Sequence, residues 1–153
     1  MPISTEACAR EVLDVVPIVM RSVRAEMRRN RAADLTVPQF RTLKFVDRQP
    51  GASLSEVAEH VGLALPSMST LVEGLVARKL VLRNTAADDR RRITLILTGH
   101  GQSLVAETYA ATQARLAESL AGLSAAERAA VVQGLEALRL IFAAPEPLEQ
   151  VKR

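Results

Sequence analysis

The sequence is poor in the residues that build disulfides, metal sites and aromatic cores. Cys8 is the only cysteine among 153 residues, so no disulfide can form within the chain, which fits a reducing cytoplasm. With a single cysteine, the two histidines His60 and His100 do not have the spacing of a zinc site. Tryptophan is absent and aromatic residues make up 3% of the chain, so aliphatic side chains must supply most of the core.

Sequence features of membrane proteins and enzymes are also missing. No run of about 18 apolar residues occurs, so no transmembrane helix is expected. The first residues carry charges inside their apolar pattern, among them Glu6, Arg10 and Asp14, which does not fit a signal peptide. There is no glycine-rich phosphate loop and no GxSxG motif. We therefore expect a cytoplasmic protein that is not an enzyme and needs no cofactor or metal.

What the sequence does contain is 48% hydrophobic residues and a local concentration of positive charge. Residues 78–92 hold six Lys or Arg side chains against Asp88 and Asp89, a net charge of +4, whereas the whole chain carries +3. The pI near 9.6 permits a polyanionic partner without requiring one. The length corresponds to one domain, or to two small lobes that share a core.

Capping boxes and apolar periodicity predict a mainly helical chain. In each box a Ser or Thr starts the helix and a Glu or Gln follows three residues later, as in Thr36 to Gln39, Ser53 to Glu56 and Ser124 to Glu127. Helices are predicted over residues 4–31, from 36 to the Pro50-Gly51 break, 53–61, from Pro66 onward, 98–120 and 124–144.

The centre of the chain has the pattern of a winged helix-turn-helix. The helix after Ser53 ends at Gly62, and only three residues separate that glycine from the helix at Pro66. Apolar runs at 81–82 and 93–97 then predict a two-stranded hairpin with a polar tip at 84–92. The predicted fold is mainly α with a small β-hairpin, a winged helix-turn-helix flanked by N- and C-terminal dimerisation helices.

The outer helices have more apolar surface than the central unit can cover. We therefore expect a twofold homodimer built from both chain ends. Five arginines crowd the end of the first helix, where cations are favoured, and contact with DNA backbone is the alternative: Arg21, Arg24, Arg28, Arg29 and Arg31. The expected domains are a dimerisation helix at 1–34, a DNA-binding domain at 35–98, dimerisation helices at 99–144 and a flexible tail at 145–153.

Four fragments, in order and at matching separations over residues 10–142, resemble the MarR family of bacterial winged-helix regulators. They are LTVPQF at 35–40, SLSEVAEHVGL at 53–63, STLVEGLVARKLVLR at 69–83 and DRRRITLILTGHG at 89–101. The resemblance implies a homodimer that binds a palindromic operator, usually as a repressor that small, often phenolic or lipophilic, ligands release. It also implies a wing pair of Asp89 and Arg91, with Arg91 in the minor groove.

The chain departs from the family pattern at three places. Lys79 stands where a glycine is common, Ala64 where a serine-type cap is common, and Thr70 or Gly74 where an arginine is common. The first departure predicts a slightly different turn after the second helix of the motif, because lysine tolerates positive φ poorly. The second predicts a shifted helix start, and the third leaves the operator sequence open.

The hydroxyl face of the helix at Pro66 predicts the major-groove contacts. Ser67, Ser69 and Thr70 are the candidates, and their hydroxyls can donate to or accept from a base. The alternative is that one of them caps the helix and another binds only phosphate.

The hairpin tip predicts the minor-groove contact. If the segment is strand-like, Arg90 and Arg92 lie on one side and Arg91 on the other, so Arg91 is the favoured residue. Asp89 would then hold a guanidinium by a charge-assisted bond. A solvated hairpin tip is the alternative.

These features predict a dimeric, sequence-specific transcriptional regulator, a repressor that an aromatic ligand releases from double-stranded DNA. We expect the ligand near the first, second and fifth helices, without assigning its residues. The alternatives are a ligand-independent DNA-binding protein, a protein-interaction module on the same scaffold, and a redox-responsive regulator that uses Cys8.

Overall fold

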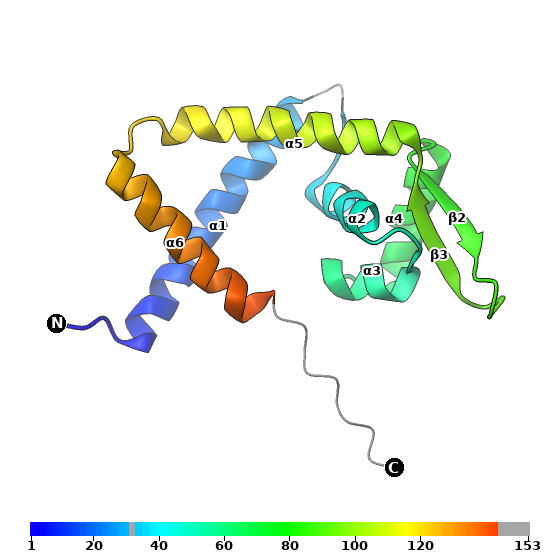
Figure 1. The fold of residues 1–153 in the computed structure, drawn as a ribbon, viewed down its shortest axis with the longest axis horizontal. Helices are drawn as coiled ribbons and strands as arrows, with labels where there is room; N and C mark the ends of the chain where they lie inside the picture. Colours follow the sequence, from blue (N-terminus) through cyan, green and yellow to red (C-terminus); the bar gives the residue numbers. More distant parts are fainter. Residues whose placement is uncertain (31–32, 144–153) are drawn as a thin grey trace, which may run out of the picture. The chain divides into compact units, whose positions relative to one another are not determined.

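The computed structural model describes residues 1–30 and 33–143, and it is mainly helical with one small sheet (Figure 1). The elements are α1 (Thr5–Arg29), α2 (Val37–Arg48), β1 (Ala52–Ser53), α3 (Leu54–Val61), α4 (Leu65–Ala77), β2 (Val81–Thr85), β3 (Ile93–Leu97), α5 (Gly99–Leu120) and α6 (Ala125–Phe142). They form two compact units, Met1–Arg115 and Leu116–Arg153, which are considered separately. The predicted tail at 145–153 lies outside the described residues.

The sequence predicts where these helices start because each capping box forms between residues three positions apart. In the box before α2, the Thr36 amide donates to Gln39 Oε1 at 2.9 Å and the Gln39 amide donates to Thr36 Oγ1 at 3.3 Å. The same reciprocal bonds form before α3 and α6, so all three predicted capping boxes are confirmed. Thr98 caps α5, since its hydroxyl oxygen accepts from the Gly101 amide at 2.9 Å.

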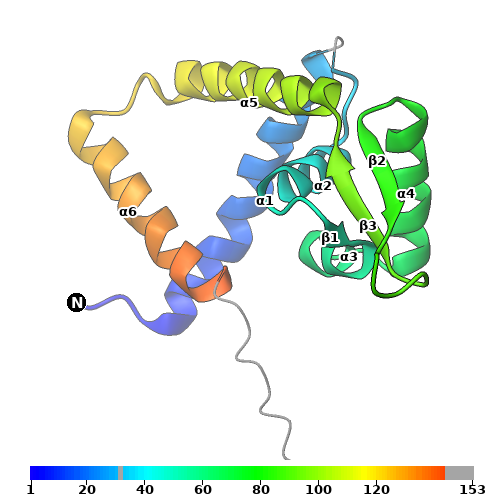
Figure 2. The ribbon, with the colours of Figure 1, turned by 45° about the vertical axis from the view of Figure 1, so that its right-hand side comes forward.

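The core lies where α2, α3 and α4 pack against one another and against the sheet (Figure 2). Its fully buried side chains include Leu43, Val46, Val57, Met68, Val72, Leu75 and Leu95. The predicted hairpin is present, and β2 pairs antiparallel with β3 from Val81–Leu97 to Thr85–Ile93. A third strand was not predicted: β1 pairs with the other edge of β3, which gives the order β1-β3-β2.

Two helices carry apolar residues that stay exposed within their own units. In α1, which runs unbroken through Pro17, only Met27 is buried. In α6 no residue is buried, and Phe142 is 77% exposed. No single helix among the described residues is long and apolar enough to cross a membrane; α3 and α4 pass that test only as a pair bent by 106°, and they supply core residues of the winged helix.

Candidate nucleic-acid interface

The outward face of α4 is set by the residues it buries on the other side. Met68, Val72 and Leu75 are completely buried, so the hydroxyl residues before and after Met68 turn away from the core. Ser67 and Thr70 are exposed and Ser69 is half-buried.

The hydroxyls of α4 do not cap the helix. The N-cap is Ala64, which offers no side-chain bond, and Pro66 occupies the first turn of the helix. Thr70 donates its hydroxyl proton to the Pro66 carbonyl at 3.2 Å, which leaves its oxygen to accept from a ligand.

The C-terminal end of α4 is fixed by contacts that sequence reasoning missed. The guanidinium of Arg78 donates to the carbonyl oxygens of Asp34 at 2.9 Å and Ala33 at 2.7 Å, which precede α2. Lys79 adopts φ 58°, so the left-handed turn forms with lysine in place of glycine. Thr98 then donates its hydroxyl proton to the Lys79 carbonyl at 2.7 Å. The end of α4 is therefore held by the α1–α2 segment and by the start of α5.

The tip of the hairpin is a tight turn and not a strand. The Arg92 amide donates to the Asp89 carbonyl at 3.0 Å, and Arg90 and Arg91 are the central residues of this turn. The expected alternation of Arg90 and Arg92 against Arg91 was therefore wrong, because it assumed extended backbone. The Asp89 carboxylate accepts the Arg91 backbone amide at 2.9 Å, so it supports the turn through the main chain.

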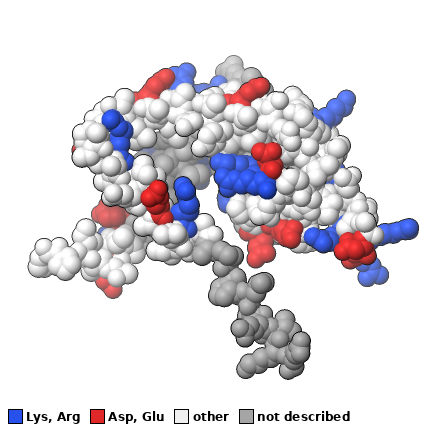
Figure 3. Space-filling model, in the orientation of Figure 1, with Lys and Arg blue, Asp and Glu red and all other residues white. Residues whose placement is uncertain are grey.

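All three tip arginines are exposed, and Figure 3 shows basic side chains around the end of the β2–β3 hairpin. The pKa of Glu56 is lowered, mainly because its carboxylate accepts the Ser53 backbone amide. Burial acts in the opposite direction, and the positive charge of Arg92 adds a smaller lowering of the pKa. On the neighbouring strand, Arg83 lies 3.9 Å from Glu73 of α4. The wing is thus linked electrostatically to both helices of the motif.

Arg41 joins α2 to the end of α3. Its guanidinium donates to the carbonyls of His60 at 3.0 Å and Val61 at 3.3 Å. These carbonyls belong to the last turn of α3, where helix bonding leaves acceptors open and cations are favoured. Gly62 follows with φ 79° and ends the helix. No local sequence pattern could predict these two bonds, since they join residues 19 and 20 positions apart.

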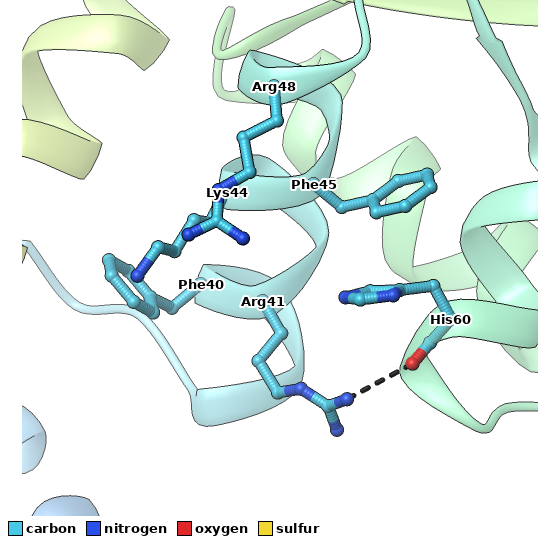
Figure 4. A pocket seen from close by; sticks show the side chains of 6 residues that line it. All are labelled: Phe40, Arg41, Lys44, Phe45, Arg48 and His60. Carbon is cyan, nitrogen blue, oxygen red and sulfur yellow. Dashed lines mark hydrogen bonds between the residues drawn. The ribbon is translucent and has the colours of Figure 1, made fainter. Parts of the chain in front are cut away.

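The same face of α2 lines two cavities among the described residues. One, of about 240 Å³, is formed with α3 by Phe40, Arg41, Lys44, Phe45, Arg48 and His60 (Figure 4). The other, of about 280 Å³, is formed with α5 by Lys44, Asp47, Arg48, Gln102, Val105, Ala106 and Tyr109. Burial, followed by the charge of Arg48, lowers the pKa of Lys44.

The candidate redox and metal residues are not brought into a site. Cys8 is an exposed free thiol near the start of α1. His60 stacks on Phe45 with ring centroids 4.3 Å apart, and His100 lies in the first turn of α5. Over residues 1–30 and 33–143, no three His, Cys, Asp or Glu side chains come together as metal ligands would.

Comparisons with known proteins agree with this geometry. A family model described as "MarR family" matches residues 33–92, from the segment before α2 to the wing tip. The HTH-type transcriptional repressor Mb2911 of Mycobacterium bovis is 30% identical over 104 residues, which cover 68% of this chain and 75% of that protein. The uncharacterised HTH-type transcriptional regulator YfiV of Bacillus subtilis is 29% identical over 69% of this chain and 66% of its own length, slightly under two thirds.

Solved structures share the fold at lower identity. RV1404 from Mycobacterium tuberculosis has a TM-score of 0.78 at 21% identity, over 95% of this chain and 99% of that one. FabT of Streptococcus pneumoniae, solved in complex with DNA, has a TM-score of 0.69 at 20% identity, over 90% and 96%. The transcriptional repressor CouR, bound to a 23-mer DNA duplex, has a TM-score of 0.70 at 23% identity, over 90% and 99%. Together with the winged helix described above, the family-model match and the 30% identity to Mb2911 show that the chain belongs to the MarR family of winged-helix transcriptional regulators.

Proposed function

We propose that this protein is a dimeric, sequence-specific DNA-binding regulator that represses transcription from a palindromic operator. The observation that carries the proposal is the pairing, in one compact unit, of an exposed hydroxyl face on α4 with an arginine-rich turn at the wing tip. A helix of this kind fits the major groove, and an arginine tip fits the adjacent minor groove, where negative potential is enhanced.

In this proposal Ser67, Ser69 and Thr70 face base edges or phosphates in the major groove. Arg91 enters the minor groove, and Arg90 and Arg92 contact the flanking backbone. Asp89 acts on Arg91 through the backbone bond that shapes the turn. FabT and CouR, which have this fold, were solved with DNA, which supports DNA as the partner here.

The dimer is proposed from the unpartnered apolar faces of the chain ends. On α1, Leu13 is 74% exposed, and on α6, Leu140 is 78% exposed. Exposed apolar side chains along the face of a helix are typical of surfaces that bury against a partner subunit. We assign residues 1–34 and 99–144 to dimerisation and 35–98 to DNA binding. A dimer would hold two α4 helices roughly 34 Å apart, one turn of DNA.

Release from DNA is proposed to follow binding of a small, aromatic molecule. Such a ligand must bind one arrangement of the two α4 helices better than the other, because equal affinity would shift nothing. The segment that holds the end of α4, with Arg78 and Thr98, is where a change in the flanking helices would reach the DNA-binding helix.

Selection of genomic fragments bound by the purified protein tests the function directly. We expect a shared motif with twofold symmetry, and sedimentation at micromolar concentration should give a dimer. Recovery of fragments without a common motif would contradict sequence-specific regulation, and a monomer would contradict the palindrome.

A further inference from the structure

The outward face of α4 carries one charged side chain, and it is a carboxylate. Glu73 is the only Asp, Glu, Lys or Arg between Leu65 and Ala77. It lies one helical turn after Ser69 and Thr70, at the i+4 and i+3 spacings that place residues on a shared face. Its side chain is 64% exposed. Phosphates repel a carboxylate, so one that is buried against DNA must be balanced by a cation and must accept a hydrogen bond.

The balancing cation comes from the wing. α4 and β2 lie side by side (Figure 2), and Arg83 Nη1 on β2 lies 3.9 Å from Glu73 Oε1. This distance is that of an ion pair and is longer than a hydrogen bond. The Arg83 guanidinium therefore balances the charge of Glu73 without occupying its oxygen atoms, which remain available as acceptors.

A carboxylate can only accept hydrogen bonds, which limits what it can recognise in the major groove. The donors on base edges there are the N4 amino group of cytosine and the N6 amino group of adenine. Adenine presents its N7 acceptor beside that donor, which repels a carboxylate, whereas cytosine has no acceptor beside N4 on its groove edge. On the protein side, nothing lies within 4 Å of where a Cβ on the neighbouring Gly74 would stand, so the approach to Glu73 is open there.

We propose that Glu73 is a specificity-determining residue, which accepts a hydrogen bond from the N4 amino group of a cytosine in each operator half-site. Arg83 is its positioning residue. The assignment rests on the proposed function, because that function places the outward face of α4 in the major groove.

A simpler role for Glu73 is to hold the wing strand through Arg83 without touching a base. Glu73→Gln separates the two roles, because glutamine has nearly the same shape and no charge. A glutamine in the major groove forms two hydrogen bonds with the N6 and N7 atoms of adenine. If Glu73 reads a base, this variant therefore gains a new preference; if Glu73 only holds the wing, it binds more weakly with the old preference.

Selection of bound sequences from a random DNA library tests the assignment. Each half-site of the wild-type motif should contain a cytosine that Glu73→Gln replaces with adenine and Glu73→Ala leaves unspecified, while the other positions keep their bases. The matched control is Glu59→Gln, which removes the same charge from an exposed position on α3 and should retain the wild-type motif.

A fixed operator measures the size of the effect. Changing that C·G pair to T·A in one half-site exchanges the N4 donor for the O4 acceptor of thymine. This change should weaken wild-type binding by about tenfold and binding by Glu73→Ala by less than about threefold. Arg83→Gln should weaken binding to the unchanged operator at least about threefold more in the wild type than in Glu73→Gln, because a neutral amide needs no balancing cation.

An identical motif for the wild type and Glu73→Gln would overturn the base-reading role and leave the proposed function standing. If Glu73→Gln selects no sequences, the fixed operator decides, and equal discrimination by the wild type and Glu73→Ala refutes the role. Equal losses from Arg83→Gln in both backgrounds would refute positioning through Glu73. If the wild type itself selects no common motif, the proposed function fails and the role of Glu73 fails with it.

Discussion

The contact between Arg78 and the α1–α2 segment gives the sharpest prediction about how the DNA-binding helix is held. Arg78→Ala removes two bonds, of 2.9 and 2.7 Å, and leaves the carbonyl of Ala33, a residue only 2% exposed, without this partner. A hydrogen bond to a charged group contributes about 1.5–3 kcal/mol. Because Arg78 itself is exposed, we discount the pair to about 2 kcal/mol in total.

Thermal and urea denaturation measure this loss. For a chain of this length, about 2 kcal/mol corresponds to a decrease in Tm of roughly 4–8 °C. Arg78→Lys should recover at most half of the loss, since an ammonium group cannot bridge both carbonyls as the fork of a guanidinium does. The adjacent Lys79→Ala serves as the matched control for lost charge, because among the described residues the Lys79 side chain makes no ion pair, and the bonds to the α1–α2 segment come from Arg78.

A second readout separates positioning of α4 from simple stabilisation. At a temperature where Arg78→Ala is fully folded, we expect it to discriminate less between an operator and the same operator with one base pair inserted between its half-sites. The reason is that α4 would be held less firmly at its C-terminal end. A Tm change below about 1 °C together with unchanged spacing preference would refute the role assigned to Arg78.

Three further predictions follow from single positions. Gly101→Ala should destabilise by about 1–3 kcal/mol in urea, because a Cβ there would overlap the backbone carbonyl of Leu80, whereas Gly134→Ala, with nothing nearby, should not destabilise. Lys79→Gly should raise the free energy of unfolding by about 1 kcal/mol, because glycine adopts φ 58° without strain. The urea midpoint should rise accordingly, and a lower midpoint would contradict this. The pKa of His60 is lowered, first by burial and then by Arg41 and Arg48. The folded state thus binds this proton more weakly than the unfolded state, so stability should fall as pH drops below about 6.5 toward the lowered pKa, and His60→Gln should flatten that part of the pH profile.

The sequence predicted the features that depend on neighbouring residues. The boxes at Thr36, Ser53 and Ser124 bond within four residues, so their motif is sufficient to place the start of each helix. The β2–β3 hairpin was visible for the same reason, as two apolar runs around a polar tip. The strand β1 was missed because it has only two residues, Ala52 and Ser53, which is too short for an alternation of apolar and polar side chains to be recognised.

Contacts between distant residues could not be read from the sequence. Arg78 finds its carbonyls 44 and 45 residues away, and Arg41 finds His60 and Val61 across the fold. In both cases the acceptor is a backbone carbonyl, and every residue has one, so the residue type does not reveal the acceptor. At the wing tip the charge was predicted but the geometry was not, because a bond from the Arg91 amide to Asp89 turns the chain where extended backbone had been assumed.

The measurement that tests the central claim most directly is the salt dependence of operator binding by the wild type and by Arg91→Ala. If α4 and the wing together form the DNA interface, the variant should bind more weakly at every salt concentration. The slope of log affinity against log salt should also be less steep, by about one unit for each arginine contact that is lost. A dimer loses one such contact from each of its two subunits. Equal affinity and equal slope for the two proteins would contradict the placement of the wing on DNA.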